Sequence, residues 1–470
     1  MQFLSLQFLC FLAIVAVCLR LCLPRWRNLL LLVASYLFYC KWDVRMAAVL
    51  LLATVLCYFA GLRESRLEAT DPASRITFGA VLILILCLAF FKLRQAVLPG
   101  NPLLPLGISY YTFRLVSYLL DVYWGKCEAV QEFVPFAAYV AFFPHMIAGP
   151  IQRASSFVPQ SEKPDAPKGR VIEGVARMAL GFAKKNLVAD NLGLFVGSAY
   201  AHLHSGSALP SLTALYLYPL QLYVDFSALT DIAIGAGLLL GIEAPENFNA
   251  PFAAKSITEF WRRWHMTLTN WVRDYVFMPL RMATRNWGNV GLAVSLTINM
   301  VLIGLWHGFT WGFLAYGLSQ SIFLVADVLT SSRRHHYYKH HPAVAKVAAW
   351  IGPIFVYHVV AVGCVFFRAP SLAIVRQLFA ELSAGPRMTR EALEFLTVPL
   401  NQLAWVAFPM YALSEMADAI RRSYGFRLPD LLPGTVKCSV YACFAVVWLL
   451  IAMSFLDTGK AASPFVYALF

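Results

Sequence analysis

Charged residues are scarce in this chain. Only 13% of its 470 residues are Asp, Glu, Lys or Arg, against about 25% in soluble globular domains. Between Asn286 and Ala326 there is no charged residue at all. A run of that length must lie in lipid or deep inside a helix bundle. The composition therefore excludes a string of water-soluble domains and predicts an all-α, polytopic membrane protein.

The chain also lacks the usual signatures of bound cofactors. Ten cysteines are present, but no CxxC pair occurs, and most of the cysteines lie inside apolar runs. There is no glycine-rich phosphate loop, no nucleophile elbow and no spacing of His, Cys, Asp or Glu typical of a metal site. We therefore expect no disulfide framework, no metal and no bound cofactor.

Positive charge exceeds negative charge, with 38 Lys and Arg against 25 Asp and Glu and a net charge of +13. Basic loops of a membrane protein face anionic lipid headgroups. A nucleic-acid interface would instead need a basic cluster interleaved with aromatic residues on a soluble domain, and the sequence has none. Membrane lipids, and not nucleic acid, are the expected partners.

Apolar segments recur along the whole chain. Several are too short to cross about 30 Å of hydrocarbon, so we expect about eleven crossings plus one or two re-entrant hairpins. The N-terminus has neither a basic leader nor a cleavage site of small residues, so the first segment is expected to be a retained span. The segments lie near 3–22, 28–40, 45–61, 77–91, 105–123, 130–148, 171–200, 211–241, 288–305, 307–330, 347–367, 398–417 and 435–456.

Polar loops are predicted at Arg63–Arg75, Arg153–Arg170, Arg333–His341 and Gly385–Glu394. The third contains SSRRHHYYKHH, in which four histidines stand close together. Metal binding is one interpretation of that tract. A solvated basic loop is favoured, because no carboxylate or cysteine accompanies the histidines.

One histidine stands in the middle of the uncharged run. It is His307 of LWHG, flanked by Trp306 and Gly308. A titratable ring in hydrocarbon is expensive and suggests function. Burial favours its neutral form, which can take a proton from a hydroxyl group and return it. The alternative is a structural histidine that bonds a neighbouring helix. Asn299 and Ser295, on preceding turns, are candidates to orient the ring.

The stretch Asp225–Arg285 has a different character from the apolar segments around it. It opens with DFS, passes through ENFNAPF and continues as SITEFWRRWHMTLTNWVRDYVF. Ser256 and Glu259 have the spacing of a capping box, which predicts a helix start. Aromatic and apolar residues then recur at steps of three to four, which predicts an interfacial helix at the headgroup level or, as the alternative, only a surface anchor. They are Phe260, Trp264, Leu268, Trp271 and Tyr275.

Taken together, these motifs resemble the membrane-bound O-acyltransferase family, and in particular its bacterial branch, whose members act on alginate, peptidoglycan and teichoic acids. The resemblance covers most of the chain from residue 100 onward. It is carried by LPLGISYYTF, FFPHMIAGPIQR, GFAKKNLVADNL, ENFNAPF, ITEFWRRWHMTLTNWVRDYVF, LIGLWHG, VFFRAPSL and the C-terminal SPFVYALF.

The resemblance implies a helical bundle around a central funnel or tunnel, with peripheral helices in 1–100, an acyltransferase core in 101–330 and further helices in 331–470. It implies catalysis by His307 and by His265 of FWRRWH. The other expected cavity residues are Trp306, Asp225, Asn247, Trp261 and Arg262, from the matched motifs, and Asn299, from its place two turns before His307.

The implied activity is transfer of an acyl group, most simply acetyl, to an exported or cell-envelope polysaccharide at the bacterial inner membrane. The expected donor is a cytoplasmic thioester, either acetyl-CoA or an acyl carrier protein. A periplasmic or extracellular O-acetyltransferase partner is expected to complete the transfer.

Departures from the branch pattern keep other activities open. Arg114 stands where the branch often has Gln, and His145 where it often has Gln or Thr. The VFM of Val276–Met278 and the AYG of Ala315–Gly317 resemble the D-alanyl-transferring members. D-alanyl transfer from a carrier protein to a teichoic acid-like polymer is therefore the alternative. A lipid-linked glycan transporter is the rival of another class, although no repeated halves are visible.

Overall fold

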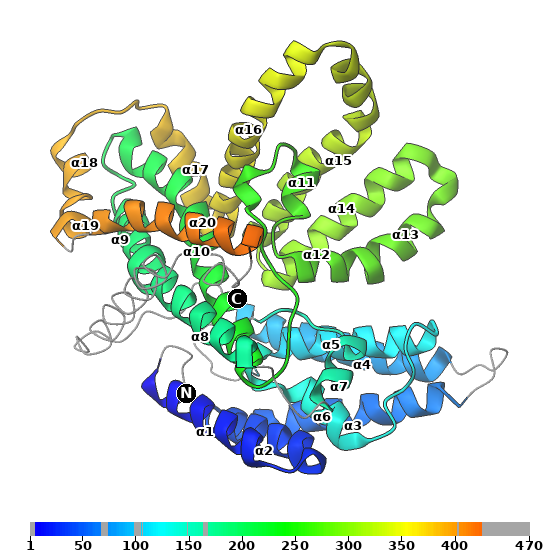
Figure 1. Ribbon diagram of the computed structural model, residues 1–470. Helices are drawn as coiled ribbons and strands as arrows, with labels where there is room; N and C mark the ends of the chain where they lie inside the picture. Colours follow the sequence, from blue (N-terminus) through cyan, green and yellow to red (C-terminus); the bar gives the residue numbers. More distant parts are fainter. Residues whose placement is uncertain are drawn as a thin grey trace. The chain divides into compact units, whose positions relative to one another are not determined.

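The computed structural model describes residues 5–66, 74–97, 105, 107–147, 149–162, 168–401 and 404–424 (Figure 1). Every regular element within these ranges is helical, so the predicted all-α class is confirmed there. The apolar segment at 435–456 and the C-terminal SPFVYALF motif lie outside the described residues. The chain divides into two compact units, one of Met1–Met178 with Thr230–Glu246 and one of Ala179–Leu229 with Asn247–Phe470.

The first unit is a helical bundle in which α5 packs against α3 and α4, and α6 packs against α2. Most of α5 is buried, including Arg114 and three tyrosines, so its sides are covered by neighbouring helices. The helices of this unit are α1 (Leu6–Leu21), α2 (Arg27–Cys40), α3 (Val44–Glu64), α4 (Ser74–Val97), α5 (Ile108–Tyr123), α6 (Phe133–Ala141), α7 (Ala154–Ser161) and most of α8 (Lys168–Ala183).

Buried arginines in the first unit are stabilised by carbonyl and carboxylate oxygens. Arg177 forms ion pairs with Asp231 and Glu246. The guanidinium of Arg114 donates to the Tyr139 carbonyl at 3.0 Å and to the His145 carbonyl at 3.2 Å. Arg114 and His145, the two positions that depart from the family pattern, are therefore in direct contact.

The second unit holds both candidate histidines. Within it, α14, α15 and α16 pack against one another in sequence order. A Cβ on Gly304 would lie 2.3 Å from the Phe313 carbonyl oxygen, and one on Gly317 would lie 2.7 Å from that of Met300. The backbones of α14 and α15 therefore touch, and only glycine fits at these two crossings.

The helices of the second unit are α9 (Asp190–Ala201), α10 (Ala208–Leu239, whose last turns belong to the first unit), α11 (Ile257–Trp261), α12 (Met266–Val272), α13 (Met278–Ala283), α14 (Gly288–His307), α15 (Trp311–His340), α16 (Pro342–Arg368), α17 (Leu372–Leu382), α18 (Arg390–Glu394), α19 (Thr397–Asn401) and α20 (Ala407–Tyr424).

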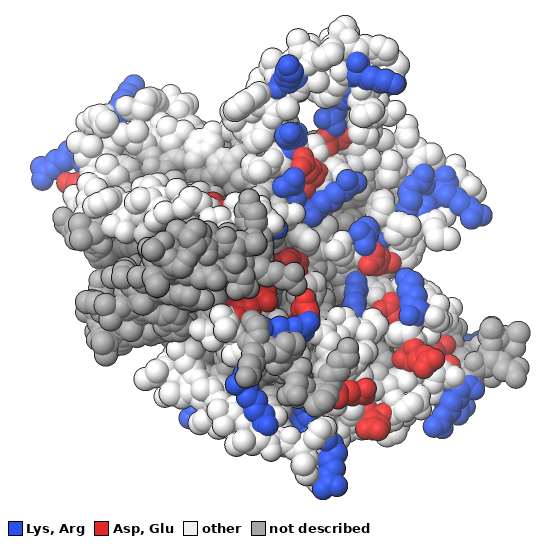
Figure 2. Space-filling model, viewed as in Figure 1, with Lys and Arg blue, Asp and Glu red and all other residues white. Residues whose placement is uncertain are grey.

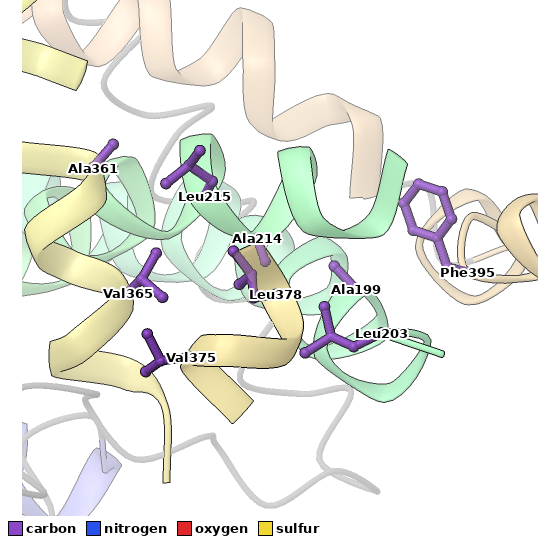
Figure 3. Close-up of a cluster of buried hydrophobic side chains, with 9 residues drawn as sticks. All are labelled: Ala199, Leu203, Ala214, Leu215, Ala361, Val365, Val375, Leu378 and Phe395. Atoms are coloured by element: carbon purple, nitrogen blue, oxygen red, sulfur yellow. The ribbon is translucent and has the colours of Figure 1, made fainter. Parts of the chain in front are cut away.

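An apolar cluster joins α9, α10, α16 and α17 of this unit (Figure 3). Leu378 and Ala199 in it are fully buried, and Phe395 closes one side. The contributing side chains come from segments up to 196 residues apart in sequence, Ala199 and Phe395 being the extremes (395 − 199 = 196). Burial of this apolar surface fixes how α16 and α17 return against α9 and α10.

Six helices among the described residues are long and apolar enough to cross a bilayer, which makes the chain a multi-pass membrane protein. The expectation of about eleven crossings stays a prediction, as does the division at residues 100 and 330. The six are Val44–Glu64, Arg75–Val97, Ala208–Leu239, Arg285–His307, Trp311–His340 and Pro342–Arg368.

Three of the predicted polar loops contain a substantial stretch of helix, and α7 (Ala154–Ser161) lies entirely within Arg153–Arg170. The tract Arg333–His341 continues α15 as far as His340, because no Gly or Pro interrupts the chain between Gly317 and Pro342. Part of Gly385–Glu394 forms α18, which Thr389 caps by accepting from the Ala392 amide at 3.0 Å. Polar composition alone did not indicate where the helices end.

Candidate active site

The FWRRWH segment is broken at its histidine. Ser256 accepts a hydrogen bond from the Glu259 amide at 3.1 Å, so the predicted capping position is confirmed as the start of α11. The expected continuation as one helix is wrong, because α11 ends at Trp261 and α12 begins at Met266. His265 lies between them with φ of 42°, a left-handed conformation that is unfavourable for a non-glycine residue.

The ENFN segment provides backbone partners for this break. The Asn247 carbonyl accepts from the Met266 amide at 2.8 Å, and the Asn249 amide donates to the Arg263 carbonyl at 3.0 Å. These bonds replace part of the hydrogen bonding that a continuous helix would have given. Asn247 and Asn249 therefore stabilise the conformation in which His265 leaves the helical path.

The Asn247 side chain also determines which nitrogen of His265 carries hydrogen. Its Oδ1 lies 2.6 Å from the Thr267 hydroxyl, 3.4 Å from the Thr267 amide and 3.3 Å from His265 Nδ1. The Thr267 amide can only donate, so the atom of Asn247 that faces it must be the oxygen. Nδ1 of His265 is then the donor in its contact, and Nε2 carries the lone pair.

His265 is buried and surrounded by aromatic rings. The Phe226 ring meets it edge-on with centroids 4.7 Å apart, and the Trp306 ring lies 6.2 Å away. Burial lowers the pKa of His265 to about 3, so the imidazole is neutral at pH 7. A neutral ring with a lone pair on Nε2 is able to accept a hydrogen bond or a proton.

The aromatic residues around FWRRWH face inward. Phe260, Trp264, Leu268 and Trp271 are all buried, whereas Tyr275 is half-buried. The surface-anchor alternative is therefore wrong for these four side chains. They form part of the packed core of the second unit, with Trp264 stacked on Phe260 at 5.5 Å.

His307 is the last residue of α14 and is 8% exposed. Its ring meets Phe367 edge-on at 4.7 Å and stacks loosely on Phe313 at 6.0 Å. A Cβ on Gly308 would lie 2.7 Å from the Phe313 ring. The glycine of LWHG therefore lets Phe313 approach the end of α14, next to the candidate base.

The predicted orienting residues on α14 do not reach His307. At about 1.5 Å of rise per residue, Asn299 lies about 12 Å and Ser295 about 18 Å away along the helix axis. Both are buried on the face that also carries His307. Ser295 donates to the Gly291 carbonyl of its own helix at 2.7 Å. Neither side chain can form a direct hydrogen bond with the imidazole.

Trp306 brings the two histidines together. Its ring centroid lies 4.6 Å from that of His307 and 6.2 Å from that of His265. The two histidines are 42 residues apart in sequence (307 − 265 = 42), yet both contact one side chain in the same compact unit. The two imidazoles thus share one aromatic neighbour within the second unit.

Asp225 is fully buried and lies 2.7 Å from the Lys185 ammonium, which also pairs with Asp190 at 2.9 Å. Lys185 and Asp190 are five residues apart, a spacing that a regular α-helix places on different faces. The π-helical turn Lys184–Ala189 brings them together. Phe226, the next residue after Asp225, packs on His265.

The two remaining predicted residues lie at the end of α11. Trp261 is 6% exposed and meets Phe260 edge-on at 5.4 Å, so it belongs to the core. Arg262 caps the helix and is exposed. The structure gives its guanidinium no contact with either histidine.

Several residues that sequence reasoning missed support the site. Asp327 of α15 accepts from the Thr258 amide at 2.9 Å and from its hydroxyl, and it also pairs with Arg334. It therefore fixes the first turn of α11 to α15. Phe313 and Phe367 are the others. Two of these residues had a signal in the sequence. Phe367 lies in the VFFRA motif, and Asp327 is the first charged residue after the uncharged run.

Groups of three or more His, Cys, Asp or Glu able to hold a metal ion are absent from the part of the chain that the structure describes. Independently of this finding, each of the two imidazoles beside Trp306 is a group that can take up and release a proton.

A model of the membrane-bound O-acyltransferase family matches residues 130–367, which include both histidines. The chain is 35% identical over 418 residues to the probable alginate O-acetylase AlgI of Azotobacter vinelandii, covering 83% of this chain and 80% of that protein. It is 30% identical over 395 residues to the peptidoglycan O-acetyltransferase of Helicobacter pylori, covering 74% and 72%.

The chain is also similar to the teichoic acid D-alanyltransferase of Bacillus subtilis. This match is shorter, 31% identical over 234 residues, and covers 48% of this chain and 59% of that protein. The family match spans half of the chain, and the two longer matches extend over more than two thirds of it. The chain therefore belongs to the membrane-bound O-acyltransferase family and is an O-acyltransferase.

Proposed function

We propose that this enzyme moves an acetyl group from a thioester donor to a hydroxyl group for O-acetylation of an exported or cell-envelope polysaccharide. His307 is the general base, and His265 is the second functional histidine. The observation that carries the proposal is the meeting of both histidines at the Trp306 ring. The long matches to alginate and peptidoglycan O-acetylating proteins support acetyl over D-alanyl as the group transferred.

The reaction needs a base and a positioned carbonyl in a region with little water. An imidazole nitrogen of His307 takes the proton of the acceptor hydroxyl as its oxygen attacks the thioester carbonyl carbon. A C–O bond forms, the C–S bond breaks, and the proton passes from the imidazolium to the departing thiolate. The aromatic rings of Trp306, Phe313 and Phe367 fix the imidazole and exclude water around it.

The donor and the setting follow from the same proposal. A cytoplasmic thioester, acetyl-CoA or an acyl carrier protein, supplies the acetyl group at the bacterial inner membrane. The polysaccharide lies beyond the membrane, so a periplasmic or extracellular O-acetyltransferase receives the acetyl group from the hydroxyl acylated at His307 and completes the transfer to the polysaccharide. Membrane lipids contact the exposed sides of the long apolar helices other than Ala208–Leu239, which is almost wholly enclosed by protein.

The test compares ester-linked groups released by mild base from cells with the wild-type protein, His307→Ala and the control His358→Ala. His358 is in the same unit, and its Nδ1 lies 2.8 Å from the Tyr216 hydroxyl. Loss of a general base lowers the rate by about 10²–10⁴-fold. Released acetate should fall to background in His307→Ala and stay near wild type in His358→Ala.

Two outcomes would change the proposal. Loss of D-alanine with acetate unchanged would assign the enzyme to D-alanyl transfer, with the same histidine as base. Wild-type levels of both groups, with His307→Ala present in the membrane in normal amount, would rule out His307 as the base.

A further inference from the structure

The end of the α15–α16 hairpin is strongly basic. We call residues 333–346 the hairpin tip. It carries Arg333, Arg334, Lys339 and Lys346 together with four histidines, and the sequence has no Asp or Glu between Val328 and Ala380. Figure 2 shows blue side chains gathered over the end of this hairpin, at the top of the view. The tip is a positive surface without acidic residues of its own.

Three of the four cations are available to a partner. Arg334 pairs with Asp327 on the preceding turns of α15. Arg333, Lys339 and Lys346 are exposed, and within the described ranges no ion pair joins them to a carboxylate. Their positive charge is therefore not neutralised inside the described part of the protein.

The tip is a preformed surface with almost no loop. α15 continues to His340, and Pro342 already begins α16. The rings of His336 and His340 lie 4.7 Å apart, and those of Tyr337 and His341 lie 4.3 Å apart. Because the turn is short and its rings pack together, a ligand would meet a backbone that is already ordered.

The tip borders a lipid-facing surface. On α16, Trp350 is 82% exposed and Ile354 is 71% exposed, within a helix apolar enough to cross the bilayer. Lys346 lies one turn before Trp350, about 6 Å along the helix. α15 has 30 residues and is about 45 Å long, longer than the hydrocarbon layer of about 30 Å. An exposed Trp next to cations is typical of the boundary between hydrocarbon and headgroups.

We propose that the hairpin tip binds the phosphate groups of anionic phospholipids through Arg333, Lys339 and Lys346. The placement of the cations one turn beyond lipid-facing side chains favours a lipid headgroup over a soluble acidic protein. This surface is separate from the histidines at Trp306 and does not depend on the acyl acceptor. It assigns the enzyme a preference for anionic lipid at one end of α15 and α16.

The test uses the full-length protein in micelles that contain equal amounts of phosphatidylglycerol and phosphatidylcholine, and native mass spectrometry counts each lipid retained. The tip variant is Arg333→Gln/Lys339→Gln/Lys346→Gln. The control, Arg376→Gln/Arg387→Gln/Arg390→Gln, removes three exposed cations from elsewhere in the same unit. Each cation near a headgroup contributes a factor of about five. The wild type and the control should prefer phosphatidylglycerol, and the tip variant should lose most of that preference.

Raised salt should weaken the wild-type preference, because the cations are exposed. A second variant, Lys346→Glu, changes one residue only. It should lower the preference for phosphatidylglycerol more than Lys346→Gln does, because Glu reverses the charge and Gln only removes it. Equal lipid ratios for wild type and tip variant would overturn the proposal. So would a control variant that loses as much as the tip variant. Binding of an acidic carrier protein that requires the tip, with lipid ratios unchanged, would reassign the surface to a protein partner.

Discussion

Replacing Asn247 with Ala removes the oxygen that orients His265. That oxygen accepts from the Thr267 hydroxyl at 2.6 Å and makes longer contacts with the Thr267 amide and His265 Nδ1. A buried donor left without its partner costs about 1–3 kcal/mol. Because one contact is short and two are long, we expect a loss of about 2–4 kcal/mol in stability. We also expect Nδ1 of His265 to lose its preference for the hydrogen.

The tautomer can be observed by nitrogen-15 NMR of the purified enzyme labelled at histidine, with His265 assigned from the signal that disappears in His265→Gln. In the wild type, Nδ1 should carry the hydrogen at pH 7. In Asn247→Ala the ring should populate the other tautomer, and the turnover number should fall by about 10–100-fold, as expected when a reacting group is misplaced by about 1 Å.

Two variants separate orientation from stability. Thr267→Val removes the shortest contact to Asn247 but leaves the one to His265, so it should lower stability and keep the tautomer. Asn247→Asp keeps an acceptor and should keep the hydrogen on Nδ1. A wild-type ring with the hydrogen on Nε2, or an Asn247→Ala ring unchanged from wild type, would refute the reasoning whatever happens to activity.

Two further predictions concern the same segment. The folded pKa of His265 is about 3, whereas the ordinary value is 6.5; the unfolded chain therefore binds more protons between these values, and stability should fall as pH drops from 6.5 towards 3, by at most about 5 kcal/mol. His265→Gln should flatten this part of a thermal unfolding profile measured in detergent, and parallel profiles would contradict it. Asp327→Ala should lower both the melting temperature and the turnover number, since it releases the first turn of α11 from α15. Arg334→Gln, which leaves the Thr258 contacts in place, should have a smaller effect, and equal losses would show that the ion pair alone matters.

Some of the site followed from the sequence because it depends on local pattern. The uncharged run around His307 marked a helix apolar enough to cross the bilayer, and the Ser256–Glu259 spacing marked the start of α11. Aromatic periodicity singled out Phe260, Trp264 and Trp271, which are buried, but the single helix that it predicted is broken at His265. It gave no indication that these side chains are covered by protein, because periodicity does not distinguish lipid from a protein core.

The rest of the site depends on contacts between distant segments. The break at His265 is stabilised by Asn247 and Asn249. The FWRRWH segment has no Gly or Pro, so its own sequence does not predict a break in the helix. Phe367 reaches His307 from another helix, and Asp327 reaches Thr258 across 69 residues. Such pairs have no spacing that a single sequence reveals.

The π-helical turn at Lys184–Ala189 makes the length of this segment as important as its composition. A π-turn contains about one residue more than an α-turn. Deleting one residue between Lys185 and Asp190 would leave them four apart, a spacing that a regular α-helix places on one face. The charge pair beside the buried Asp225 would then form without a π-turn. An added residue would place Lys185 and Asp190 six apart, on different faces of an α-helix. This segment should therefore accommodate a deletion more easily than an insertion.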